Sequence, residues 1–145
     1  MSVILNKIIK MNKNMRNGRS SELVVCSKLI LLGLDIYVPL VDDQGIDFII
    51  CIKTNRHIKC YPVQVKSVEN HNSIVGVKKN KIAVLIIHYR NTNNKDEFYY
   101  FTNEQIDLFY KDTKWNDFSL NNKGRYDFKH QTLEDLSHKI LNDEL

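Results

Sequence analysis

Three polar side chains stand in two otherwise apolar segments of this 145-residue chain. Asp47 is flanked by isoleucine and phenylalanine, and Gln64 and Lys66 alternate with valines further along. Because side chains alternate between the two faces of a strand, Gln64 and Lys66 are predicted to point the same way. Upstream, Glu22 adds a second carboxylate to another apolar segment. A carboxylate pair, an amide and an ammonium could together form a metal site.

On a helix, Glu22 would share one face with Val25, Cys26 and Leu29. A carboxylate within such an apolar face is costly unless it has a partner. The alternative is that Glu22 lies in the first helical turn, where the helix dipole favours a solvated negative charge. Both interpretations remain open from the sequence.

The other three residues also have structural interpretations. Asp47 could be an edge residue or could close a turn after Gly45. Gln64 and Lys66 could form the solvated face of an antiparallel strand. The order of a helical Glu, a strand Asp and a strand Gln-x-Lys within 45 residues nevertheless favours a shared site.

Oxygen ligands from Glu22, Asp47, the Gln64 amide and a backbone carbonyl near Val65 would suit Mg²⁺, with Mn²⁺ as an alternative. Such a metal can polarise a phosphoryl group, lower the pKa of a bound water and stabilise a departing oxygen. Lys66 would orient the attacking water or help to deprotonate it, and would offset phosphate charge. The predicted chemistry is hydrolysis of a phosphodiester.

Two helices are expected at the start of the chain. Residues 3–15 have a loose helical pattern that Asn17-Gly18 is predicted to break. A second helix is predicted from a cap at Ser20 or Ser21 to about Leu32, with Gly33 ending it in a left-handed conformation.

The remaining pattern alternates strands and helices. The continuous apolar run 82–88 is typical of a strand buried on both faces, and 46–52 with 58–65 is typical of a hairpin. Thr102 and Gln105 have capping-box spacing, which opens a helix to about Tyr110. Other expected strands are 36–38 and 98–101, a second hairpin joins 117–120 to 126–128, and Thr132 caps a last helix to about Asn142. The predicted fold class is α/β, a mixed central sheet flanked by helices.

Composition sets further bounds on the protein. The length suits one domain, no apolar run approaches the roughly 20 residues of a bilayer span, and residues 1–10 do not resemble a signal peptide. We therefore expect a cytoplasmic protein without a membrane partner.

Cys26, Cys51 and Cys60 lack metal-ligand spacing and are expected to be reduced core thiols. The five histidines are scattered, and each is expected to be structural.

Charge is unevenly distributed along the chain. Residues 1–90 hold 14 Lys and Arg against 6 Asp and Glu, and residues 91–145 hold 7 against 11. A basic body suits a polyanion such as DNA, although A/T-rich coding would also enrich lysine. The candidate DNA-backbone contacts, which could equally be ordinary solvated surface, are Arg16, Arg19, Lys78, Lys79 and Lys81.

Three segments together resemble the PD-(D/E)XK nuclease superfamily. They are Gly18-x-x-x-Glu22, Asp42-Asp43-Gln44-Gly45-Ile46-Asp47 and Val63-Gln64-Val65-Lys66-Ser67. The pattern looks like that of small single-domain members, including endonucleases associated with group I introns. The resemblance covers about residues 16–110, and residues 111–145 are expected to add a hairpin and a helix to a single nuclease-like domain.

The resemblance implies a restriction-endonuclease-like core and a metal-dependent DNA endonuclease. It assigns catalytic positions to Glu22, Asp47, Gln64 and Lys66, with Asp47 as the main metal ligand. Gln64 replaces the commoner acid, which should lower metal affinity. Since cutting both strands of a duplex requires two sites, the resemblance also implies a homodimer. The alternatives are an inactive nucleic-acid-binding protein of the same fold and a protein-interaction module.

Overall fold

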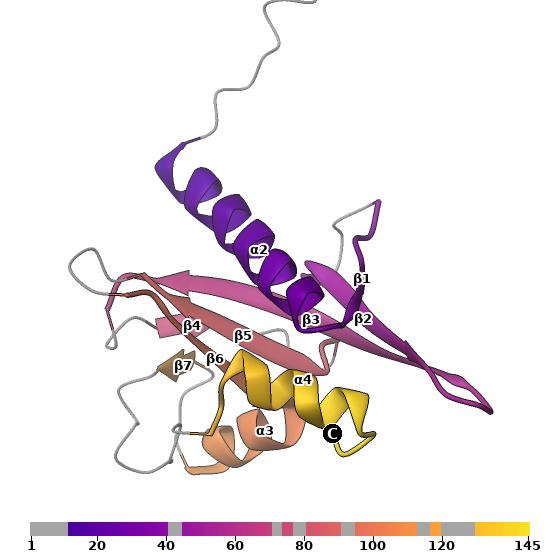
Figure 1. Ribbon diagram of the computed structural model, residues 1–145. Coiled ribbons are helices and arrows are strands. Elements are labelled where there is room, and N and C mark those ends of the chain that lie inside the picture. Colours follow the sequence, from indigo (N-terminus) through magenta and orange to yellow (C-terminus); the bar gives the residue numbers. More distant parts are fainter. Residues whose placement is uncertain are drawn as a thin grey trace, which may run out of the picture.

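The computed structural model describes residues 12–40, 45–70, 74–76, 81–90, 95–112, 117–119 and 130–145. A five-stranded sheet has the order β1-β2-β3-β5-β6, and β4 pairs with β7 in a separate two-stranded sheet (Figure 1). The elements are α2 (Lys13–Leu31), β1 (Asp35–Tyr37), β2 (Phe48–Lys53), β3 (Ile58–Val68), β4 (Ile74–Gly76), β5 (Val84–Tyr89), β6 (Glu97–Thr102), α3 (Asn103–Asp112), β7 (Asp117–Ser119) and α4 (Leu133–Leu141). The expected α/β class, a mixed sheet flanked by helices, is confirmed.

The sheet is mixed because β3 pairs in parallel with β5, whereas the other neighbouring strands of this sheet are antiparallel. The predicted hairpin of β2 and β3 is present, with Phe48 opposite Val63 at its open end. The first five residues of β5 are all buried, as its continuous apolar sequence predicted. Because β3 and β5 run parallel, their polar C-terminal ends lie side by side in the middle of the sheet.

Helices cover both faces of the sheet (Figure 1). Val25 and Leu29 of α2 pack with Leu136 and Ile140 of α4 against one face. Ile106 of α3 packs against the other. Along β3 the odd-numbered valines face α2, and Val68 faces α3. Since side chains alternate along a strand, Gln64 and Lys66 belong to the α3 face.

Helix α2 differs from the prediction at its start. It begins at Lys13, and the side chain of Asn12 caps it by accepting the N–H of Met15 at 2.9 Å. The predicted break at Asn17-Gly18 is therefore wrong, as are the caps at Ser20 and Ser21. The predicted helical residues 3–11 lie outside the described part of the chain. Gly33 ends the helix with φ +94°, as expected.

The two other helix starts agree with the sequence. The side chain of Gln105 accepts the Thr102 N–H at 2.9 Å, and the Thr102 hydroxyl accepts the Gln105 N–H at 3.3 Å. This is the predicted capping box. Thr132 caps α4 by accepting the N–H of Asp135 at 3.1 Å.

Two expectations change in the remaining elements. Cys51 and Cys60, directly opposite each other in the β2–β3 hairpin, form a disulfide, so the prediction of reduced thiols is wrong for this pair. Cys26 is free. Strand β7 pairs with β4, and its predicted partner 126–128 lies outside the described residues. Of the helices described, none has the length and apolar character of a bilayer span.

Candidate metal and phosphate site

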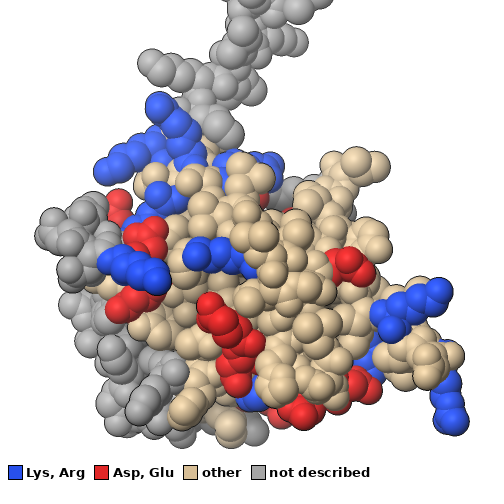
Figure 2. Space-filling view, in the orientation of Figure 1, with Lys and Arg blue, Asp and Glu red and all other residues tan. Residues whose placement is uncertain are grey.

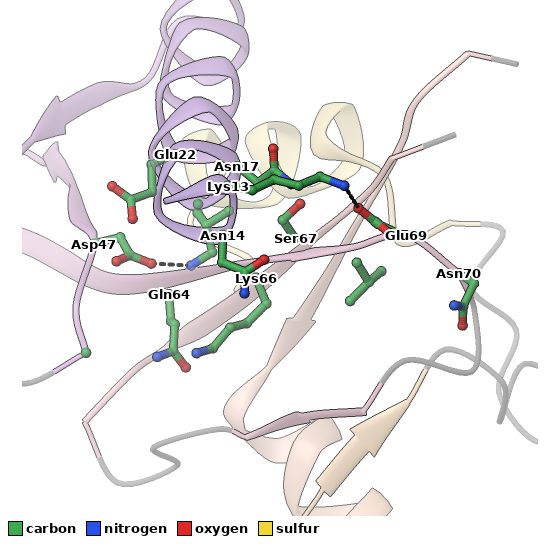
Figure 3. A pocket seen from close by; sticks show the side chains of 14 residues that line it. Lys13, Asn14, Asn17, Glu22, Asp47, Gln64, Lys66, Ser67, Glu69 and Asn70 are labelled. Atoms are coloured by element: carbon green, nitrogen blue, oxygen red, sulfur yellow. Dashed lines mark hydrogen bonds and ion pairs between the residues drawn. The ribbon is translucent and has the colours of Figure 1, made fainter. Parts of the chain in front are cut away.

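One pocket gathers the four polar residues that the sequence singled out (Figure 3). It lies between the N-terminal half of α2, the start of β2 and the C-terminal half of β3. Its lining includes Glu22, Asp47, Gln64 and Lys66, together with Lys13, Asn14, Asn17, Gly18, Gly45, Val65, Ser67, Val68, Glu69 and Asn70. The candidate DNA contact Lys81 lines a different pocket.

Asp47 lies where β2 separates from β3. Its N–H donates to the Val63 carbonyl at 2.9 Å, and its side-chain oxygen Oδ2 accepts the Val65 N–H at 2.6 Å. The Asp47 carboxylate thus takes the place of the β2 backbone carbonyl that would otherwise accept the Val65 N–H in the β2–β3 ladder. This bond holds the Asp47 side chain at the mouth of the gap between the strands.

The Val65 carbonyl faces the same gap. The Val63 carbonyl and the Val65 N–H both bond to Asp47, so these two residues direct their backbone groups toward β2. The carbonyls of Pro62 and Val68 instead accept N–H groups from residues that flank β5. In a strand, the N–H and C=O of one residue point to the same side. The carbonyl oxygen predicted as a ligand is therefore directed toward Asp47.

Glu22 reaches the pocket from α2. It is the tenth residue of the helix, so the alternative that placed it in the first turn is excluded. Its Oε2 forms an ion pair with Arg19 Nη1 at 3.0 Å, and its side chain is 22% exposed. Arg19, a candidate DNA contact, thus also offsets the charge of Glu22.

The thiol of Cys26 is affected by the charges of both Glu22 and Asp47. Burial, together with the negative charges of Glu22 and Asp47, raises the pKa of Cys26 to about 11. Both carboxylates therefore lie near enough to the Cys26 thiol to act on it electrostatically.

Gln64 and Lys66 extend from β3 in the same direction (Figure 3). Gln64 is only 5% exposed, which excludes the solvated-face alternative for this residue. Its side-chain oxygen Oε1 is buried and has no hydrogen-bond partner among the described residues. Lys66 is half-buried and, within the described part of the chain, forms no ion pair.

These groups fit a hard cation better than a soft one. No cluster of three or more His, Cys, Asp or Glu residues suited to a metal occurs in the described residues. The available donors are instead two carboxylates, an amide oxygen and a backbone carbonyl, and oxygen donors suit Mg²⁺ or Mn²⁺. Leaving Gln64 Oε1 unpaired costs free energy that an oxygen-seeking ligand would recover.

Arg90, just after β5, fixes α2 over the site. Its Nη2 donates to the Asn17 carbonyl at 2.7 Å and to the Ser21 hydroxyl at 3.0 Å, and its Nε donates to the Ser67 hydroxyl at 2.8 Å. The sequence analysis missed this residue. The signal was present as a charged side chain directly after a buried strand. Its bond to the Asn17 carbonyl lies within the stretch where the sequence predicted a helix break.

Ser21, His88 and Asp96 form a second hydrogen-bonded chain next to Arg90. His88 Nδ1 lies 2.8 Å from Ser21 Oγ, and Nε2 lies 2.7 Å from Asp96 Oδ2. This order matches a nucleophilic triad, but Ser21 is 1% exposed and its hydroxyl is held by Arg90. Substrate cannot reach such an oxygen, so the chain is structural. His88 is therefore a structural histidine, as expected.

Positive charge lies close to the pocket. Arg16 and Arg19 are exposed on the N-terminal half of α2, where Figure 2 shows Lys and Arg side chains gathered. Lys13 lines the pocket and pairs with Glu69 at 3.9 Å. Lys78 and Lys79 lie outside the described residues.

No protein-family model and no curated protein matches this sequence. Among solved structures, the chain is similar to that of a bacterial homing endonuclease, I-Ssp6803I. The TM-score is 0.49 and the sequence identity 15%, over 64% of this chain and 71% of that chain.

Proposed function

We propose that this protein is a Mg²⁺- or Mn²⁺-dependent DNA endonuclease with a restriction-endonuclease-like core of the PD-(D/E)XK type. The observation that carries the proposal is the buried side-chain oxygen of Gln64, which has no hydrogen-bond partner among the described residues and lies at a pocket that also holds Glu22, Asp47 and Lys66. A purely structural Gln would be expected to have its oxygen bonded. These oxygen donors, with the Lys66 ammonium in the lining of the same pocket, support the proposal of a cation site.

In the proposed reaction, Asp47, Glu22 and the Val65 carbonyl would hold the cation, with Gln64 Oε1 as a further oxygen donor from β3. When bound, the cation would supply Lewis-acid chemistry at the phosphate and at water. The Val65 N–H keeps the Asp47 carboxylate in place before substrate arrives. Lys66 contributes positive charge where the phosphate gains negative charge, and orients the attacking water.

DNA is proposed as the substrate because exposed cations border the pocket. Arg16, Arg19 and Lys13 all lie on the N-terminal half of α2, beside Asn14 and Asn17 of the lining. Arginine, lysine and asparagine are common donors to phosphate oxygens. Contacts of this kind predict binding that weakens steeply with salt.

The proposal is tested with supercoiled, linear and branched DNA incubated with Mg²⁺ or Mn²⁺, with EDTA as the metal-free control. We expect wild type to cleave at least one substrate and Lys66→Met to reduce the rate by roughly 10²- to 10⁴-fold. Lys59→Met is the matched control, since Lys59 lies at the other end of β3 and pairs with Asp143.

Asp47→Asn provides a second, independent measurement. Asparagine can still accept the Val65 N–H, so the strand arrangement should persist while the negative charge is lost. We expect Mn²⁺ binding, followed by calorimetry, to disappear in this variant. Metal binding without cleavage of any DNA would favour an inactive binding protein, and cleavage that survives Lys66→Met would refute the assigned site.

A further inference from the structure

The hairpin of β2 and β3 extends beyond the other strands of the main sheet (Figure 1). Pairing of β2 with β1 ends at Cys51, and pairing of β3 with β5 begins only at Val63. Residues 52–59 therefore form a two-stranded arm whose strands, among the described residues, pair only with each other. The disulfide between Cys51 and Cys60 joins the two strands where this arm begins.

A tight turn at the end of the arm presents Asn55 and Arg56 to solvent. The N–H and the hydroxyl of Thr54 both donate to the His57 carbonyl, each at 2.9 Å, and the His57 N–H donates to the Thr54 hydroxyl at 3.2 Å. The two residues between them are exposed, and Arg56 forms no ion pair with any residue that the structure describes. The turn thus holds an amide and a guanidinium at the outer end of the arm.

One face of the arm continues the face of the sheet that carries Gln64 and Lys66. Because side chains of β3 alternate, Ile58 and Cys60 lie on this same face. Lys53 is directly opposite Ile58 and therefore belongs to it as well. Ile58 is 65% exposed, and Cys60 and Lys53 are also exposed. The face that holds the candidate site thus continues along the arm as accessible surface.

The charge of this part of the chain is of one sign. Residues 48–68 contain four Lys and Arg residues and no Asp or Glu. Figure 2 shows Lys and Arg side chains at the outer end of the arm. The exposed Asp35 of β1 lies beside Cys51, where the arm begins, and Asp143 pairs with Lys59 on the opposite face. A projecting segment without acidic residues suits a polyanion such as DNA.

We propose that the arm enters the major groove of duplex DNA, where Asn55 and Arg56 contact base edges. Paired strands lie about 4.8 Å apart, and the major groove is about 12 Å wide and admits a two-stranded ribbon. Arginine binds guanine and asparagine binds adenine through paired hydrogen bonds. Lys53, on the face shared with the candidate site, contacts the DNA backbone. The disulfide reduces the freedom that the arm loses on binding.

The length of β3 sets the spacing between the bases that the arm contacts and the bond that is cleaved. Residues 57 and 64 lie roughly 23 Å apart, at about 3.3 Å per residue of strand. This length corresponds to roughly seven base pairs at about 3.4 Å each. The preferred bases should therefore lie within one turn of the double helix from the cleaved phosphate.

The inference rests on the proposed function for its DNA substrate, but binding tests it without cleavage. In a Lys66→Met background with Mg²⁺, where bound DNA should be cut only slowly, the protein selects duplexes from a randomised library. We expect a preferred sequence to be enriched. Adding Arg56→Met should reduce discrimination at one base pair by about 5- to 100-fold and leave the other positions unchanged.

Two lysines on opposite faces of the arm provide a matched pair of variants. By fluorescence anisotropy on a mixed-sequence duplex, Lys53→Met should weaken binding and lower the slope of log affinity against log salt by about one. Lys59→Met is the control, because it removes the same charge from the face that meets Asp143. It should bind as tightly as the parent protein.

Three results would overturn the inference. They are an unchanged sequence preference in Arg56→Met, equal losses of affinity in Lys53→Met and Lys59→Met, and binding of single-stranded DNA in preference to duplex. Failure of the nuclease proposal gives a different result. A protein that binds duplex DNA through the arm but cleaves nothing with Mg²⁺ or Mn²⁺ would refute the nuclease alone, and cleavage unaffected by the arm variants would refute the arm alone.

Discussion

The carboxylate of Asp47 accepts the backbone N–H of Val65 at 2.6 Å. This bond joins the first side chain before β2 to the strand that carries Gln64 and Lys66. A carboxylate that a backbone N–H already orients would lose little conformational entropy on binding a cation. Part of the ordering of the site therefore exists in the folded protein before any cation binds. The bond also leaves the Val65 carbonyl directed into the pocket.

Gln64→Met should increase stability while weakening metal binding. Methionine has a similar shape and removes a buried oxygen that nothing in the described part of the chain bonds, and whose desolvation costs about 1–3 kcal/mol. We expect a higher unfolding temperature in EDTA than wild type, and a smaller rise on adding Mn²⁺. Differential scanning calorimetry measures both. A variant less stable than wild type in EDTA would indicate that the amide has a structural partner instead.

Arg90→Met should destabilise the protein by roughly 3 kcal/mol. The substitution leaves the Ser21 and Ser67 hydroxyls and the Asn17 carbonyl without their charged donor. Urea denaturation measures the loss, and Arg56→Met, on the exposed β2–β3 turn, should change little. Because α2 carries Glu22, Mn²⁺ affinity should also fall. Unchanged affinity would show that Arg90 only stabilises the fold.

Stability should fall below about pH 6.5, the ordinary pKa of histidine. Burial lowers the pKa of His88, an effect that its bond to Asp96 only partly opposes. The folded state therefore favours the neutral ring. Its contribution is complete above the unfolded pKa and is lost as pH falls through the lowered folded pKa.

The measurement for His88 is urea denaturation at pH 7.5 and 5.5. The loss of unfolding free energy between these values should shrink in His88→Gln. It should persist in His138→Gln, since His138 is exposed on α4. An equal loss in wild type and His88→Gln would assign the pH dependence to other groups.

Thiol titration should detect one free cysteine in the unreduced, denatured chain and three after reduction. In the folded protein Cys26 should react slowly at pH 8, because its pKa of about 11 leaves little thiolate. Reduction of the Cys51–Cys60 bond should lower the free energy of unfolding by about 2–4 kcal/mol. Three reactive thiols without reductant would contradict the disulfide.

Local sequence patterns predicted most of the sheet and the helix ends. The β-branched run of β5, the capping box at Thr102 and the cap at Thr132 each depend on residues within a few positions. The start of α2 was mispredicted because Asn17-Gly18 was interpreted as a helix break, whereas Asn12 caps a helix that runs through it and that Arg90, 73 residues from Asn17, ties to the end of β5. The β4–β7 pairing is likewise non-local and involves only three residues on each strand.

The sequence predicted which residues line the candidate site, but not the contacts that these residues make. The polar positions of β3 stand out against apolar neighbours, so Gln64 and Lys66 could be found by alternation alone. The bond between Asp47 and Val65, the ion pair of Glu22 with Arg19 and the unpaired oxygen of Gln64 depend on how three elements meet. The disulfide depends on strand register, which places Cys51 directly opposite Cys60.

That disulfide has a consequence for the far end of the hairpin. A slip of one residue between two strands would turn every side chain of one strand to the opposite face. The covalent bond between Cys51 and Cys60 prevents such a slip and so keeps Asp47 opposite Val65. A disulfide at the turn end of the hairpin thus fixes how Asp47 of one strand is aligned with Gln64 and Lys66 of the other, at a distance from the pocket.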